Sequence, residues 1–199
     1  MPRPASYDRT VALHAAMTLF WEKGFHATSL KDLEATLKMR PGSIYAAFNS
    51  KEQLYSSAMK YYFEAARDAF GDEMERAPSP LAGLADHIRS YANLPADHPG
   101  RQVCMLLKTI VDTQTTEPAL SLQAREHLRD IRAQISAVFD EAKRQGELPT
   151  DADCNRLAQR FQANLNALRV ELHQSDGTDD LTVLAEDMAN EVERLRHSG

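Results

Sequence analysis

Apolar residues three and four positions apart recur along nearly the whole chain, and this helical spacing constrains the fold more than any other sequence feature. Leu30, Leu33 and Leu37, for example, fall on one face of a helix predicted over residues 29–37. Runs of alternating β-branched residues do not stand out, and the glycines and prolines lie between the periodic segments. The spacing therefore predicts an all-α protein.

Turn and capping residues separate the predicted helices. The first helix is expected to bury Val11, Ala15, Ala16, Leu19 and Phe20, and Gly24 ends it. Thr28 or Ser29 caps the second helix, with Asp32 in its first turn. The predicted helices cover residues 8–23, 29–37, 40–48, 51–75, 81–94, 101–116, 119–145, 151–173 and 179–197.

Composition excludes several classes of protein. The hydrophobic fraction of 43% and charged fraction of 26% are those of a soluble globular chain. The N-terminus lacks the apolar core of a signal peptide, and no apolar run approaches the roughly 18 residues of a membrane helix. Two cysteines without an export signal do not form a disulfide framework, so we expect a cytoplasmic protein.

The formal net charge of −6 is unevenly distributed. Residues 1–60 hold eight Lys or Arg against five Asp or Glu, whereas residues 61–199 hold fifteen against twenty-four. Only the N-terminal third, at +3, could therefore lie against a polyanion without net repulsion.

The stretch from Thr28 to Leu54 has the organisation needed to read DNA. Two short helices meet at a tight turn, and the second begins with the small and polar residues Gly42 and Ser43. The major groove is about 12 Å wide and admits one helix, whose N-terminal residues approach the base edges. Leu33, Leu37, Ile44 and Phe48 supply an apolar wall behind these helices.

The same stretch resembles the N-terminal signature of the TetR family of helix-turn-helix regulators. The residues that carry the resemblance are Leu19-Phe20, Gly24-Phe25, Thr28-Ser29-Leu30, Asp32-Leu33, Gly42-Ser43-Ile44-Tyr45, Phe48 and Ser50-Lys51-Glu52-Gln53-Leu54. A weaker similarity is Gly146-Glu147-Leu148-Pro149 followed by Asp151 and Asp153. The resemblance implies a three-helix DNA-binding domain over residues 1–50 and a helical bundle over residues 51–199 that binds an effector and dimerises.

The resemblance also implies roles for single residues. Thr28 would hold a phosphate through its hydroxyl or a backbone N–H. Arg40 to Ser43 would touch bases, and Tyr45 and Lys51 would contact phosphates. Lys38 stands where the family usually has a turn glycine, and a left-handed residue there costs about 1 kcal/mol. The expected DNA-binding residues are Thr28, Lys38, Arg40, Pro41, Gly42, Ser43, Tyr45, Ala46, Ala47 and Lys51.

Two further sets of candidate residues lie in the predicted bundle. The resemblance implies an effector pocket enclosed by the middle helices, about residues 51–145, and the aromatic and methionine content there suggests a small apolar or aromatic effector. The candidate lining residues are Tyr62, Phe63, Phe70, Ile88, Tyr91, Cys104, Met105, Leu107, Ile110 and Phe139. Stripes on the last two helices favour a homodimer interface made by Leu157, Phe161, Leu165, Leu168, Leu172, Leu184, Met188 and Val192. For any of these residues, ordinary core packing is the alternative.

No catalytic motif, cofactor loop or metal-ligand spacing stands out, and the seven histidines are scattered. We therefore expect no enzyme, no cofactor and no metal, but a repressor that binds a near-palindromic operator as a dimer and is released by a small molecule. A DNA-binding architectural protein without effector is one alternative.

A second alternative is a thiol-based sensor of electrophiles or oxidants acting through Cys104. Within a helix predicted from residue 101, Arg101 at i−3 and Lys108 at i+4 would favour the reactive thiolate. A small buried core residue is the plainer interpretation. Cys154 would serve as the internal comparison, since Asp151 and Asp153 would raise its pKa.

Overall fold

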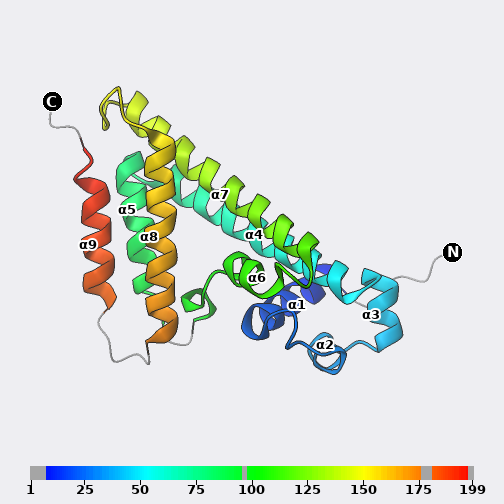
Figure 1. Ribbon diagram of the computed structural model, residues 1–199. Coiled ribbons are helices and arrows are strands. Elements are labelled where there is room, and N and C mark those ends of the chain that lie inside the picture. The colour runs from blue at the N-terminus through cyan, green and yellow to red at the C-terminus, as the bar shows by residue number, and fades with distance from the viewer. Residues whose placement is uncertain (1–7, 96–97, 176–180, 197–199) are drawn as a thin grey trace. The chain divides into compact units, whose positions relative to one another are not determined.

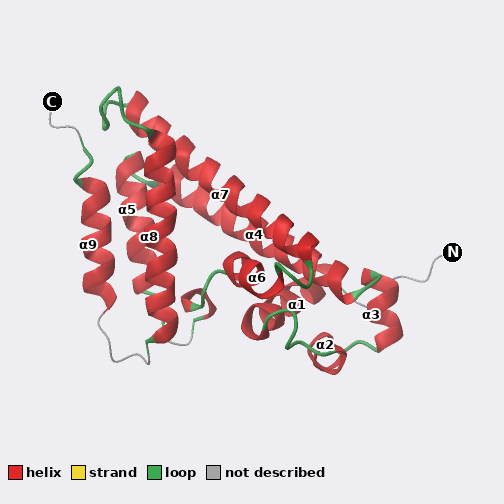
Figure 2. Cartoon of the chain, viewed as in Figure 1, coloured by secondary structure: helices red, strands yellow, loops and turns green. Residues whose placement is uncertain are grey.

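The computed structural model describes residues 8–95, 98–175 and 181–196. Every helix or strand assigned within these ranges is a helix, as Figure 2 shows, so the predicted all-α class is confirmed. The elements are α1 (Arg9–Lys23), α2 (Leu30–Leu37), α3 (Pro41–Phe48), α4 (Lys51–Arg76), α5 (Pro80–Ala92), the 3-10 helix η1 (Pro99–Arg101), α6 (Met105–Thr113), α7 (Pro118–Arg144), α8 (Cys154–Gln174) and α9 (Leu181–Glu193). Within the described ranges, none of these helices is long and apolar enough to cross a membrane.

The first of two compact units comprises the chain up to Ala65 together with Met105–His127. It contains α1, α2 and α3, which follow one another in blue and cyan in Figure 1, and it also contains α6. Phe20 and Phe25 both meet the ring of Tyr55 edge-on, with centroids 4.7 and 5.2 Å apart. This aromatic cluster joins α1 to the start of α4.

The second unit comprises Ala66–Cys104 and the chain from Leu128 onward. Its helices α5, α8 and α9 lie side by side (Figure 1). Leu84, Ile88, Phe139 and Leu168 are at most 1% exposed in its core. Apolar stripes on three neighbouring helices thus bury one another, as the spacing predicts.

Arg89 on α5 forms ion pairs with two glutamates of α9. Its guanidinium donates to both carboxylate oxygens of Glu186 at 2.8 Å, and also to Asp86 at 3.0 Å and Glu193 at 2.9 Å. The hydrogen bonds to the Glu186 and Glu193 carboxylates raise the pKa of Arg89. The bidentate pair thus adds a directional contact between α5 and α9 to their apolar packing.

Most helix boundaries lie within two residues of the predicted ones, but α6 begins at Met105 rather than residue 101 and ends at Thr113 rather than 116. His98 and Pro99 start the 3-10 turn η1 instead, with the Gly100 amide donating to His98 Nδ1 at 3.0 Å. Helix α8 begins at Cys154 rather than residue 151, and α9 ends at Glu193, while the bounds predicted for α9, 179 and 197, lie outside the described residues. The buried face of α1 is also turned by about one residue. Val11, expected in the core, is 64% exposed, because Ala12, Leu13, Ala16, Met17 and Phe20 point inward.

The two compact units do not coincide with the predicted division at residue 50. The beginning of α4 and the whole of α6 belong with α1, α2 and α3. One reason is a buried hydrogen bond between the Tyr55 hydroxyl and Thr109 Oγ1, 2.7 Å long, which ties α4 to α6. Helices α1, α2 and α3 therefore share a compact unit with segments that the sequence assigned to the other domain.

Candidate functional site

Helix α3 has one buried face and one exposed face. Ile44 and Phe48 are 1% and 3% exposed, so the inner face is apolar as predicted. On the other side the chain exposes Lys38, Arg40, Pro41, Gly42, Ser43, Tyr45 and Ala46, while Ala47 is half-buried. We call this surface, residues 38 to 47 without the inward Ile44, the reading face. The sequence-predicted base-reading residues thus lie together and are accessible.

The N-terminus of α3 is open to an anion. Pro41 occupies the first turn, and Arg40 at the N-cap position makes no side-chain hydrogen bond to the helix amides. Without such a cap, the positive end of the helix dipole faces outward beside a guanidinium. This arrangement suits a phosphate oxygen or the electronegative edge of a base.

Lys38 adopts the left-handed conformation predicted for the turn between α2 and α3. Its backbone angles are φ 52° and ψ 38°, and its side chain is exposed. The strain of about 1 kcal/mol is small, and the position adds a cation next to Arg40. Basic groups therefore flank both sides of the turn that leads into α3.

Lys51, at the start of α4, lies over an aromatic ring. Its ammonium is 4.5 Å from the centroid of Phe25, and partial burial lowers its pKa. The ring holds the cation by its face while leaving the ammonium able to take another partner. Tyr45 is 42% exposed on α3. Both predicted phosphate-contacting side chains are therefore at least partly accessible.

Thr28 does not offer its side chain for a phosphate. It is fully buried, and its hydroxyl donates to the Gly24 carbonyl at 2.7 Å. The N-cap of α2 is Ser29, which forms a capping box with Asp32. Thr28 instead closes the turn that leads from α1 to α2, and the prediction for its hydroxyl is corrected accordingly.

Asp32 concentrates three contacts at that turn. Its carboxylate accepts from Lys23 Nζ at 2.6 Å, from the Ser29 amide at 2.8 Å and from the Ser29 hydroxyl at 2.6 Å. These hydrogen bonds, that of Lys23 first, depress the pKa of Asp32 well below its ordinary value. The carboxylate thus joins the end of α1 to the beginning of α2.

This depression predicts a pH-dependent stability. Because the folded-state pKa lies below the unfolded value of roughly 4, Asp32 stabilises the fold above that value and loses this effect as pH falls through the folded pKa. Asp32→Asn should therefore be less stable than the wild type at pH 7, with a difference that shrinks towards pH 3. Urea denaturation at several pH values measures it. Glu34→Gln removes the same charge from α2 without the cap contacts, and a constant difference for Asp32→Asn would contradict the assignment.

The residues predicted to line an effector pocket fall into both units. Tyr62, Phe63, Met105, Leu107 and Ile110 belong to the first unit, and Phe70, Ile88, Tyr91, Cys104 and Phe139 belong to the second. In the first unit Tyr62 meets Trp21 edge-on at 5.0 Å and Phe63 stacks on His127 at 4.3 Å. In the second, Phe70, Ile88 and Phe139 are part of the apolar core.

A polar group that the sequence reasoning missed lies among the aromatic residues of the second unit. His87 Nδ1 is 2.6 Å from Glu73 Oε2, and its ring meets Phe70 and Tyr91 edge-on at 4.9 and 5.3 Å. Burial raises the pKa of Tyr91. The i, i+4 spacing of His87 and Tyr91 on α5 was the available signal, but only folding brings Glu73 of α4 to the imidazole.

The residues predicted for a dimer interface divide in two. Phe161, Leu168, Leu172 and Val192 are buried in the chain's own core. Leu157, Leu165, Leu184 and Met188 are half-buried, so they retain surface for a partner. The first four have little area left to offer, because α5 takes up part of the stripe.

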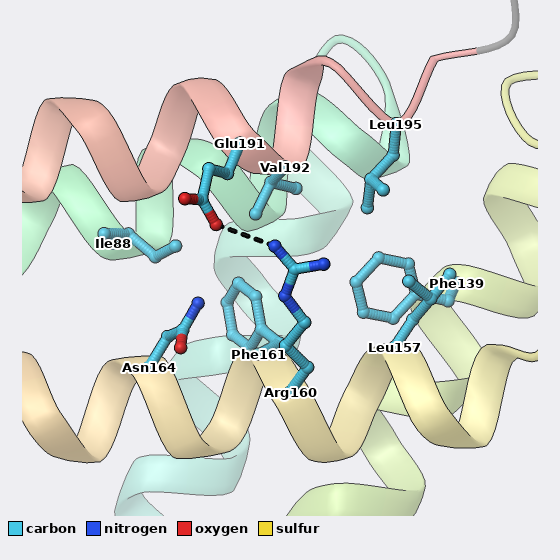
Figure 3. A pocket seen from close by; sticks show the side chains of 9 residues that line it. All are labelled: Ile88, Phe139, Leu157, Arg160, Phe161, Asn164, Glu191, Val192 and Leu195. Carbon is cyan, nitrogen blue, oxygen red and sulfur yellow. Dashed lines mark hydrogen bonds and ion pairs between the residues drawn. The ribbon is translucent and has the colours of Figure 1, made fainter.

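A small hollow lies between α8 and α9. Figure 3 shows Arg160 reaching across it to Glu191, an ion pair of 2.8 Å. Its volume of about 20 Å³ is close to what one water molecule needs, and is too small for a drug-sized ligand. The lining side chains are Ile88, Phe139, Leu157, Arg160, Phe161, Asn164, Glu191, Val192 and Leu195.

Both cysteines are buried. Cys104 is 4% exposed and precedes α6 instead of lying inside it, which corrects its predicted position. The two cations expected beside it are engaged elsewhere, since Arg101 donates to the Leu94 carbonyl and Lys108 to two carbonyls of α1. Cys154 has a raised pKa, as predicted. Burial is the main cause, followed by Asp140 of α7, which sequence proximity could not identify.

Two family models match the chain. The model described as bacterial regulatory proteins, tetR family, matches residues 12–58, which contain α2, α3 and the reading face. The model described as tetracyclin repressor-like, C-terminal domain, matches residues 80–184, more than half of the chain. The matches cover both the candidate DNA-binding helices and most of the second unit.

Individual relatives agree with these matches. The HTH-type transcriptional repressor ComR of Escherichia coli is 26% identical over 188 residues, which cover 92% of this chain and 88% of ComR. A TetR-family regulator from Cytophaga hutchinsonii has a similar structure with a TM-score of 0.84, 19% identity and coverage of 100% and 99%. A cysteine mutant of the TetR-family regulator CifR, complexed with 26-base-pair operator DNA, has a TM-score of 0.75, 27% identity and coverage of 98% and 100%.

Proposed function

Since the chain belongs to the TetR family and is a transcriptional regulator, we propose that it is a cytoplasmic, homodimeric repressor released from its operator by a small molecule. The observation that supports this proposal most directly is the reading face. There the N-terminus of α3 is exposed and uncapped, and Lys38 and Arg40 lie beside it. The operator complex of CifR supports DNA as the partner of the corresponding surface here.

Some residues of the reading face would contact DNA bases, and others would contact the phosphates of the DNA backbone. Arg40 and Ser43 lie at the leading end of α3, where side chains approach base edges, and Ala46 can add only a methyl contact. Lys38 and Tyr45 of this face, together with Lys51 at the start of α4, hold phosphates, which set the position of the helix in the groove. One such helix reads few bases, so a second copy is needed for specificity.

The second copy would pack on α8 and α9. Leu157, Leu165, Leu184 and Met188 keep exposed area on these helices, and Val183 is 59% exposed on α9. A two-fold dimer places two reading faces against half-sites about one helical turn apart, which requires a near-palindromic operator. Light scattering at micromolar concentration tests this arrangement, and a monomer mass would contradict it.

The effector would bind in the second unit, where aromatic rings surround the Glu73–His87 pair. An aromatic or apolar body can stack on these rings while His87 or Tyr91 meets a polar group. Because coupling is reciprocal, operator DNA must then weaken effector binding by the same factor. A thermal-shift screen of small molecules, repeated with saturating operator, separates this mechanism from an architectural protein without effector.

The thiol-sensor alternative is less well supported. A sensing cysteine must be reached by its oxidant, and Cys104 is 4% exposed with its expected cations bound elsewhere. Burial instead favours its role as a small core residue.

A gel-shift with the DNA upstream of the chain's own gene tests operator binding directly. A retarded band that a scrambled fragment of equal length does not compete away supports the proposal. Equal retention of both fragments contradicts a sequence-specific repressor.

Two substitutions on the candidate interface should have distinguishable effects. Lys51→Ala should weaken binding to every sequence and lower the slope of log affinity against log salt by about 0.9, the value for one neutralised phosphate. Ser43→Ala should mainly change which operator sequence is preferred. Fluorescence-anisotropy titrations of operator and scrambled duplexes at several salt concentrations measure both.

The matched control is Lys60→Ala, which removes an exposed α4 lysine paired only loosely with Glu64 at 3.6 Å. It removes the same charge at a distance from the reading face and should leave the slope unchanged. An unchanged slope for Lys51→Ala would exclude a phosphate contact by that side chain.

A further inference from the structure

One face of α6, together with the turn after it, lies against the turn between α1 and α2. Lys108 and Asp112 are spaced at i and i+4, so they fall on one side of α6, and Thr116 lies in the turn that follows the end of α6 at Thr113. All three meet the short segment Trp21–His26, although they are far from it in sequence. The first unit therefore contains a contact between α6 and the turn that precedes the DNA-binding helix pair.

Lys108 caps the end of α1 from outside that helix. Its ammonium donates to the Trp21 carbonyl at 3.1 Å and to the Glu22 carbonyl at 2.8 Å. The last carbonyls of a helix have no partner within the helix, and a cation is favoured at this negative end of the dipole. The side chain is half-buried, so water screens these bonds less than at an open surface.

The other two positions continue the contact along the turn. Asp112 Oδ2 lies 2.9 Å from where a Cβ on Gly24 would be, so this carboxylate lies directly against the turn. Thr116 Oγ1 is 2.8 Å from His26 Nε2. Each contact on its own is weak, but together they hold both ends of the turn against α6.

From the turn the connection reaches the reading face. The Thr28 hydroxyl bonds to the Gly24 carbonyl, and the Ser29–Asp32 capping box begins α2 directly after it. Helix α2 in turn packs beside α3. A displacement of the end of α1 would therefore move the start of α2, and with it the angle at which α3 is presented.

We propose that Lys108 is a positioning residue for operator recognition, acting through its bonds to the Trp21 and Glu22 carbonyls. This inference rests on the proposed DNA-binding function and names how α6 controls it. With the ammonium in place, the turn holds α2 and α3 in the arrangement that fits the operator.

The test uses the full-length protein and three variants. Lys108→Met removes the ammonium and keeps an apolar stem of similar length, whereas Lys108→Arg keeps a charged donor and should restore the cap. Lys60→Met, on the exposed side of α4, removes the same charge without touching α1. Binding is followed on two probes, the duplex from upstream of the chain's own gene and a scrambled duplex of the same length.

Lys108→Met should lose about tenfold in affinity for the upstream duplex, within the range usual for coupling between sites, and change little on the scrambled duplex. Lys108→Arg should recover most of the loss. A residue that only stabilises the fold would not alter the ratio between the two probes, since both need the folded protein. An unchanged ratio in Lys108→Met overturns the positioning role.

Amide hydrogen exchange of the free protein tests the cap without DNA. In Lys108→Met, amides of residues 24–30 should exchange faster while those of α5 and α8 keep their rates. If no variant and no wild-type protein distinguishes the two duplexes, the proposed repressor function fails, yet faster exchange would still support the cap. Unchanged exchange at residues 24–30 overturns the cap itself. If Lys108→Met does not fold, Thr116→Val removes the His26 bond from the same turn and is judged by the same two measurements.

Discussion

Replacing Phe20 by alanine is expected to lower the free energy of unfolding by about 3–5 kcal/mol, the usual cost of emptying a buried aromatic site. Phe20 is completely buried in α1, and its ring meets Tyr55 edge-on at 4.7 Å. Tyr55 also holds Phe25 and hydrogen-bonds Thr109, so the cavity would open where α1, α4 and α6 converge. The surrounding helices cannot collapse into it without giving up those contacts.

Urea denaturation followed by circular dichroism measures this loss. Val11→Ala, on the same helix but 64% exposed, is the matched control and should change the free energy of unfolding by less than about 0.5 kcal/mol. Operator affinity at a temperature where the variant is folded should fall as well, since the cluster supports the turn before α2. A cost for Phe20→Ala as small as that for Val11→Ala would show that the core is not centred on this ring.

Gly24→Ala should destabilise the protein by about 1–3 kcal/mol, the range for a residue forced into sparsely populated backbone conformations. Gly24 has φ 82° and ψ 172°, a region that is essentially restricted to glycine. An added Cβ would also approach Asp112 Oδ2 to 2.9 Å, although that side chain can move aside. The backbone strain therefore dominates, and the turn that carries α2 absorbs it.

Gly42→Ala provides the contrast. Gly42 lies in the first turn of α3, and a Cβ there would meet no atom within 4 Å. Alanine favours a helix over glycine by up to about 1 kcal/mol, so this variant should fold at least as well as the wild type. Its added methyl group lies on the reading face, and operator affinity should change instead. Thermal unfolding together with anisotropy titration separates the two effects, and equal stability for both variants would contradict the strain at Gly24.

The caps and turns of α1, α2 and α3 were predictable because they depend on residues close to them in the sequence. Gly24 ends α1, Pro41 begins α3 and Lys38 takes the left-handed turn, each within a few positions of the element it controls. The apolar spacing also identified Leu33, Ile44 and Phe48 as inward residues.

Errors arose where a choice depended on packing. The sequence allowed either Thr28 or Ser29 as the cap of α2, and the structure buries Thr28 against Gly24. Val11 has the right spacing for the core, but the inward face of α1 is turned away from it. The spacing of apolar residues locates the buried stripe of a helix only to within about one residue, which is about 100° around the helix axis. Which side of that stripe is buried depends on the helices that pack against it.

By itself the sequence determined an all-α chain, its main helix boundaries and its family, since short-range spacing and capping decide these features. The tertiary structure alone decided which distant groups meet. Lys108 on the end of α1, Arg89 on Glu186 and Asp140 beside Cys154 join residues of different helices. Such pairs carry no periodic signal, because each is set by the angle and register at which two helices pack, and these depend on the whole core.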